Sequence, residues 1–170
     1  LNQFEPNWKN YYKALYRVNM LLSKIDQIDW EGEVAYRNSI EAQARFLRAY
    51  FYFDMVRLWE RVPLIIVPTK DNVPQSEPDA IYAQIAEDLL FAAENGMEEV
   101  SPGRVNKWAA KSLLARVFLF YTGYYNKTDL VGKVSKAQAL QGLEDVISSQ
   151  KYGLVGTNND GKEFKDLWPA

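Results

Sequence analysis

The groups that could carry acid–base chemistry in this chain are carboxylates, because its 170 residues include no histidine and no cysteine. Histidine is the commonest general base, and the cysteine thiolate is a strong nucleophile. A carboxylate pair can still hydrolyse a glycoside when one member has a raised pKa. The candidates are Glu87, Asp88, Glu98, Glu99 and Asp129. Their sequence contexts predict polar helix faces or loops, so we expect no raised pKa, no catalytic residue, no metal site and no cofactor.

Aromatic rings beside amide groups form a second chemical pattern. Carbohydrate sites use it, because a ring stacks on a sugar face while polar groups donate and accept hydrogen bonds. Tyr124, Tyr125 and Asn126 combine these groups at the end of a predicted helix, and Trp168 lies in an irregular segment rich in asparagine. These four are the candidate carbohydrate-binding residues. The alternative is that the tyrosines close a core and that Trp168 anchors the tail.

The stretch from Glu41 to Leu64, EAQARFLRAYFYFDMVRLWERVPL, must position any such site, because it is the most strongly patterned part of the chain. Its apolar residues recur at steps of three and four on two helix faces: Ile40, Ala44, Leu47, Phe51, Met55 and Leu58 on one, and Phe46, Ala49, Tyr50, Phe53 and Val56 on the other. A helix apolar on two sides lies between neighbours. We therefore expect its aromatic run to pack in the core rather than to form a sugar platform.

Charged residues of the same helix are spaced for pairing. Glu41 precedes Arg45 by one helical turn, and Asp54 precedes Arg57 in the same way. We expect these arginines and Arg48 to hold neighbouring helices rather than a ligand.

The helices themselves form a repeating pattern. The string FLRAYFYF resembles LLARVFLF further along the chain, and Arg116 then falls near Arg48, which predicts a comparable structural role for it. The expected boundaries are a first hairpin over 7–59, a second over 78–125, the start of a third over 135–150 and an irregular tail over 151–170. A helical pair that occurs twice is typical of stacked hairpins that share one core. The sequence thus predicts a single all-α domain, a tetratricopeptide-like array of about five helices.

Composition restricts the possible function classes. The chain is 48% hydrophobic and 25% charged, which is ordinary for a globular domain. A net charge of −2 argues against a nucleic-acid surface. No apolar run approaches the roughly 18 residues of a membrane span. The chain begins LNQFEPNW, without Met or leader, so we expect a piece of something longer.

Four segments, in order, carry a family resemblance. The stretch from Glu41 to Leu64 resembles the signature helix of the SusD/RagB family, and SPGRVNKWAAKSLLARVFLFY resembles its second signature. The first helix is similar through Trp8, Tyr11 and Tyr12, and the fifth through VISSQKYGL. The departures are Glu60-Arg61, where the family has Gly-Asp, and Trp108, where a smaller residue is commoner.

The resemblance implies a non-catalytic, lipid-anchored protein at the cell surface of the outer membrane. Such proteins capture oligosaccharides and pass them to a TonB-dependent transporter. This chain would be mainly the helical scaffold, and the anchor would lie outside it. The alternative, which rests on the hairpin repeat alone, is a helical scaffold that binds a protein partner and no sugar.

Overall fold

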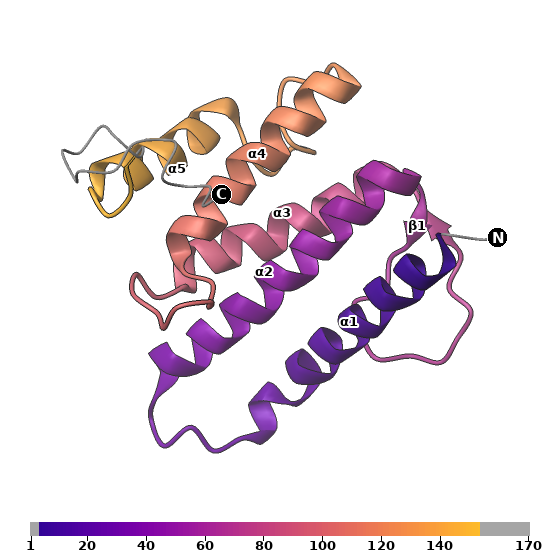
Figure 1. The fold of residues 1–170 in the computed structure, drawn as a ribbon, viewed down its shortest axis with the longest axis horizontal. Coiled ribbons are helices and arrows are strands. Elements are labelled where there is room, and N and C mark those ends of the chain that lie inside the picture. The colour runs from indigo at the N-terminus through magenta and orange to yellow at the C-terminus, as the bar shows by residue number, and fades with distance from the viewer. Residues whose placement is uncertain (1–3, 154–170) are drawn as a thin grey trace, which may run out of the picture.

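The computed structural model describes residues 4–153. Its elements are α1 (Glu5–Lys24), the 3-10 helix η1 (Ile25–Gln27), α2 (Val34–Trp59), β1 (Val62–Pro63), β2 (Gln75–Ser76), α3 (Pro78–Asn95), α4 (Lys107–Tyr125) and α5 (Lys136–Ser148). Each α-helix packs against the next one in the chain (Figure 1). The predicted all-α array of stacked helical hairpins is confirmed. Within the described residues, no helix has the length and apolarity needed to cross a membrane.

Helix α2 lies between α1 and α3, as its pattern predicted (Figure 1). The prediction of two fully packed faces was wrong in part. Leu47 is 39% exposed and Leu58 is 63% exposed, although both belong to the predicted apolar faces. These positions project between the two neighbouring helices, onto the open side of α2. Tyr52, which neither face included, is completely buried.

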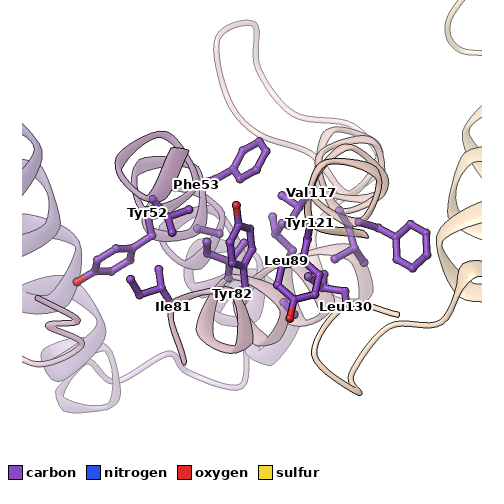
Figure 2. Packing of buried hydrophobic residues seen from close by; sticks show 14 of the residues in the cluster. Tyr52, Phe53, Ile81, Tyr82, Leu89, Val117, Tyr121 and Leu130 are labelled. Atoms are coloured by element: carbon purple, nitrogen blue, oxygen red, sulfur yellow. The ribbon is translucent and has the colours of Figure 1, made fainter. Parts of the chain in front are cut away.

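The core lies among α2, α3 and α4. Figure 2 shows Tyr82 of α3 between Phe53 of α2 and Tyr121 of α4. Its ring centroid lies 6.5 Å from that of Phe53 and 4.8 Å from that of Tyr121. Ile81, Ile85 and Leu89 continue the same face of α3, and all are fully buried. These three rings therefore fill the core, and Tyr82 and Tyr121 are unavailable to a ligand.

The helix ends follow local signals. The Asn106 side chain accepts a hydrogen bond from the backbone N–H of Ala109, so α4 begins at Lys107. Ser135 and Gln138 form a capping box at the start of α5. The first helix ends at Lys24 and continues only as η1. Trp30 Nε1 donates to the Ile25 carbonyl at 2.8 Å, which stabilises this end.

The segment between α2 and α3 is extended and held by side chains. Val62 and Pro63 pair with Ser76 and Gln75 in a short antiparallel ladder, which closes the segment into a loop. Tyr12 donates to the Pro63 carbonyl at 2.9 Å. The sequence did not predict this ladder, because two residues are too few to show a period.

One glycine permits a close approach between helices. A Cβ atom on Gly96 would lie 2.7 Å from the Ala92 carbonyl oxygen and 3.0 Å from the Lys107 nitrogen. A side chain at this position would therefore force the backbone between α3 and α4 to shift.

Candidate functional site

The predicted tyrosines lie at the C-terminal end of α4, and the structure brings them together. The Tyr124 side chain is 68% exposed, and its ring stacks on Phe120 with a centroid distance of 5.5 Å and an interplanar angle of 10°. Tyr125 meets Tyr124 edge to face at 4.8 Å. The two rings have different environments, because Tyr125 packs inward against Tyr82 and Tyr121. Only Tyr124 presents an accessible ring.

Asn126 ends α4 in the left-handed conformation, with φ 53° and ψ 50°. Asparagine tolerates this conformation better than most residues do. Its backbone N–H donates to the Thr122 carbonyl, while the residue as a whole is exposed. The helix end thus places an accessible ring and an accessible amide two residues apart in the chain.

Packing behind the rings fixes this end of α4. Arg57 of α2 lies over the Phe53 ring, 4.3 Å from its centroid, and 5.9 Å from the centroid of Phe120. It also pairs with Asp54, as predicted. Burial raises the pKa of Tyr125, and the Glu60 charge adds to the rise. The Tyr125 hydroxyl is therefore neutral at physiological pH and can both donate and accept a hydrogen bond.

Trp168, the fourth candidate, lies outside the described residues. The candidate site is therefore defined by Tyr124, Tyr125 and Asn126. This arrangement offers stacking and hydrogen bonding.

Four of the five candidate carboxylates lie in polar surroundings, as predicted. Glu87 pairs with Lys133 at 2.7 Å, and Glu99 pairs with Lys151 at 3.1 Å. Glu98 pairs with Lys107, whose hydrogen bond lowers the Glu98 pKa. The Asp129 side chain accepts a hydrogen bond from a backbone N–H at 2.6 Å.

The prediction for Asp88 was wrong, because its side chain is fully buried between α3 and α2. Burial raises its pKa, and hydrogen bonds from Arg48 oppose the rise. Arg48 Nε and Nη2 each donate to one Asp88 oxygen at 2.7 Å. This fork-to-fork geometry occupies both oxygens. Asp88 is thus a structural anion. Because it is fully buried, it cannot reach a substrate as an acid catalyst would.

Arg48 is the centre of a buried polar cluster. The sequence predicted only that this arginine holds neighbouring helices. Its Nη1 donates to Asn19 Oδ1 of α1 at 3.1 Å and to the Ile66 carbonyl at 3.2 Å. Asn19 in turn donates to the Ile65 carbonyl at 2.8 Å. The Arg48 cluster, comprising Arg48, Asp88, Asn19 and the two carbonyls, joins α1, α2, α3 and the extended segment.

Arg116, predicted to act in a comparable way, is exposed. The buried residues around it in α4 are Leu114, Ala115, Val117 and Phe118. The repeat alignment was therefore out of register with the burial pattern. No group of three or more acidic, histidine or cysteine side chains within residues 4–153 could hold a metal ion.

The chain is similar to known proteins in both sequence and fold. Residues 2–119 match a SusD-like family model described as starch-binding associating with outer membrane. A SusD-like protein of Bacteroides ovatus is 32% identical over 124 residues, which cover 70% of this chain and 23% of that protein.

Two solved structures are similar in fold. A laminarin-binding SusD-like protein aligns with a TM-score of 0.66 and 29% identity, over 82% of this chain and 29% of that one. A structure with xylogluco-oligosaccharide aligns with a TM-score of 0.75 and 29% identity, over 87% of this chain and 30% of that one. The chain spans about a quarter of the length of the curated relatives it matches.

Proposed function

Because the chain belongs to the SusD-like family, we propose that it is the helical scaffold of a non-catalytic protein that captures oligosaccharides. In this proposal the protein acts at the outer membrane, on the cell surface, and is held there by a lipid anchor outside this chain. It passes its sugars to a TonB-dependent outer-membrane transporter. The oligosaccharide and the transporter are its two partners.

The observation that carries the proposal is the shared helical array. The same fold occurs in a laminarin-binding SusD-like protein and in a structure with xylogluco-oligosaccharide, at 29% identity in each case. Both ligands have an uncharged glucan backbone. Aromatic stacking and hydrogen bonds from uncharged groups can recognise such a sugar. The accessible ring of Tyr124 and the exposed Asn126 have the chemistry for a sugar contact of this kind.

The carboxylates support a non-catalytic role. Glycoside hydrolysis requires an accessible acid with a raised pKa. Asp88 is the candidate carboxylate whose pKa is raised, and it is buried in the ion pair with Arg48. Glu87, Glu98 and Glu99 each pair with a lysine at the surface.

Calorimetry tests the proposal with laminarin oligosaccharides and xylogluco-oligosaccharide on this chain and on the complete protein. The Tyr124→Ala variant removes the accessible ring, and Tyr36→Ala is its matched control, because Tyr36 is 47% exposed on α2. A ring that stacks on sugar predicts about tenfold weaker binding for Tyr124→Ala only. If the complete protein binds the sugar and both variants keep the same affinity, this chain acts only as a scaffold. Absence of binding to a broad panel by the complete protein would refute the proposal.

A protein-binding scaffold without sugar binding is the second candidate, and one observation favours it. Helix α2 exposes an apolar stripe on its open side, formed by Tyr36, Leu47, Tyr50 and Leu58. Exposed aromatic and aliphatic residues in one row are typical of protein interfaces. If the Leu47→Glu/Leu58→Glu variant of the complete protein loses co-purification with a transporter and no glycan ever binds, this candidate replaces the first.

A further inference from the structure

Helix α1 is the edge helix of the layer (Figure 1). A shallow groove lined by its side chains runs along it. Its volume is about 660 Å³, more than twice the 300 Å³ of the groove between α1 and α2. Side chains in two rows line it, one aromatic and one cationic: Trp8, Tyr12 and Tyr16, and Lys9, Lys13 and Arg17. Each row repeats every four residues, or about 6 Å along the helix. We call this the α1 groove.

The aromatic row is anchored from behind. Trp8 packs edge to face on Trp59 of α2 at 5.1 Å, and its centroid lies 5.1 Å from that of Tyr12. Tyr12 donates its hydroxyl to the Pro63 carbonyl. Tyr16 is 49% exposed. Trp8 and Tyr12 are thus held by packing and by a hydrogen bond, so a ligand stacked on Trp8 would cost little side-chain entropy there, while Tyr16 adds an exposed ring to the row.

Two of the three cations in the second row have no ion-pair partner among the described residues. Lys9 pairs with Glu5 at 2.5 Å. Lys13 and Arg17 make no ion pair within residues 4–153, and both are exposed. The chain as a whole carries a net charge of −2, so this row of one sign is a local feature rather than a general one. A ligand that complements it carries negative charge.

We propose that the α1 groove binds an acidic oligosaccharide, one whose sugar rings carry carboxylate groups. The rings of Trp8 and Tyr16 stack on sugar faces, while Lys13 and Arg17 pair with the carboxylates. Arginine suits this role because its planar fork can hold a carboxylate by two hydrogen bonds. The inference rests on the proposed sugar-binding function, but it places a charged-sugar site on α1, apart from Tyr124 on α4.

The α1 groove also distinguishes a sugar from an acidic peptide. A peptide needs partners for its backbone N–H and C=O groups. The groove is lined by helix side chains, whose backbone groups are already bonded within α1. Rings with an adjacent cation match a saccharide that has a flat face and a carboxylate at its edge.

The experiment is calorimetry on the complete protein that contains this chain, with oligogalacturonate, a neutral galacto-oligosaccharide and a polyglutamate peptide. The proposal predicts that oligogalacturonate binds and that its affinity falls as salt is raised. Lys13→Gln/Arg17→Gln weakens it about tenfold, from two partly exposed ion pairs. Tyr16→Ala weakens it as well. The matched control, Lys70→Gln/Lys127→Gln, removes the same charge from exposed positions elsewhere and leaves the affinity unchanged.

Four outcomes would overturn the proposal: no binding of oligogalacturonate at low salt, equal losses in groove and control variants, no loss in Tyr16→Ala, or equal affinity for polyglutamate. Helical circular dichroism of each variant checks that α1 is intact. Calorimetry with the neutral glycans laminarin and xyloglucan separates this inference from the proposed function. If neutral glycans bind through Tyr124 and oligogalacturonate does not bind, only the α1 groove proposal fails.

Discussion

Replacing Arg48 by methionine tests whether the Arg48 cluster holds the helices together. The substitution keeps most of the side-chain volume and removes both 2.7 Å hydrogen bonds to Asp88. It leaves a carboxylate that is fully buried. Breaking a buried ion pair by removing one partner costs roughly 3–5 kcal/mol. Arg45 remains 3.8 Å from Asp88, and Gln84 still donates at 3.1 Å, so we expect the lower end, about 3 kcal/mol.

This loss is large for a domain whose unfolding free energy is about 5–15 kcal/mol. The melting temperature should fall by roughly 6–12 °C. Urea unfolding followed by helical circular dichroism measures the change. Arg116→Met is the matched control, because Arg116 is an exposed arginine on α4. Its effect should stay within about 0.5 kcal/mol.

Acid should relieve the loss. Burial already raises the pKa of Asp88, and Arg48 opposes that rise, so its removal raises the pKa further. The folded variant then binds a proton that the unfolded chain, with an aspartate pKa of about 3.9, does not bind. Stability of the variant therefore increases as pH falls through that window, and its deficit is smaller at about pH 5 than at about pH 7.

Two results would refute this reasoning. One is a loss below about 1 kcal/mol for Arg48→Met, well under the cost of an unpaired buried charge. The other is a deficit that grows on acidification. The double variant Arg48→Met/Asp88→Leu supplies a third check, because removing both charges should recover most of the loss.

Three further substitutions test local features. Tyr52→Phe removes a hydroxyl that accepts from the Ile65 N–H at 2.6 Å and donates to its carbonyl at 2.9 Å, and it should cost about 1–3 kcal/mol and speed hydrogen exchange at Ile65. Gly96→Ala should lower stability by about 1–3 kcal/mol in urea unfolding, because its Cβ meets backbone at 2.7 Å, whereas Gly123→Ala, with open space, should raise stability by up to about 1 kcal/mol. Ser135→Ala removes the capping box and should cost about 1 kcal/mol, seen as faster exchange in the first turn of α5.

The sequence predicted the framework well where the signals are local. Helix α2 ends at Trp59, where the first hairpin was expected to end, and α5 begins after Ser135, the expected start of the third hairpin. Apolar period, proline position and capping residues each lie within a few residues of the boundary they set. Such signals need no knowledge of which elements become neighbours.

Errors arose where burial depends on those neighbours. Asp88 has a polar sequence context beside Glu87, yet α2 places Arg48 opposite it. Leu47 and Leu58 continue an apolar face that no described helix covers. Arg116 is exposed, although its neighbour in the chain, Ala115, is buried. The α1 groove was not predicted either, although its two rows can be read at steps of four once the outer side of α1 is known.

The candidate site at the end of α4 was placed correctly as a helix terminus, and its sugar contact remains a prediction. Sequence alone could not separate Tyr124 from Tyr125. Neighbouring positions on a helix differ by about 100° in direction, so one ring faces solvent while the other faces Tyr82.

The Arg48 cluster also dictates an order of events during synthesis. Asn19 precedes Arg48 by 29 residues, and Asp88 follows it by 40. At about 5–20 residues per second, a ribosome makes Asp88 roughly 2–8 s after Arg48. Until then the first helical pair contains an arginine whose anionic partner does not yet exist. The nascent pair of α1 and α2 therefore lacks the Asp88 contact of the Arg48 cluster until α3 has emerged.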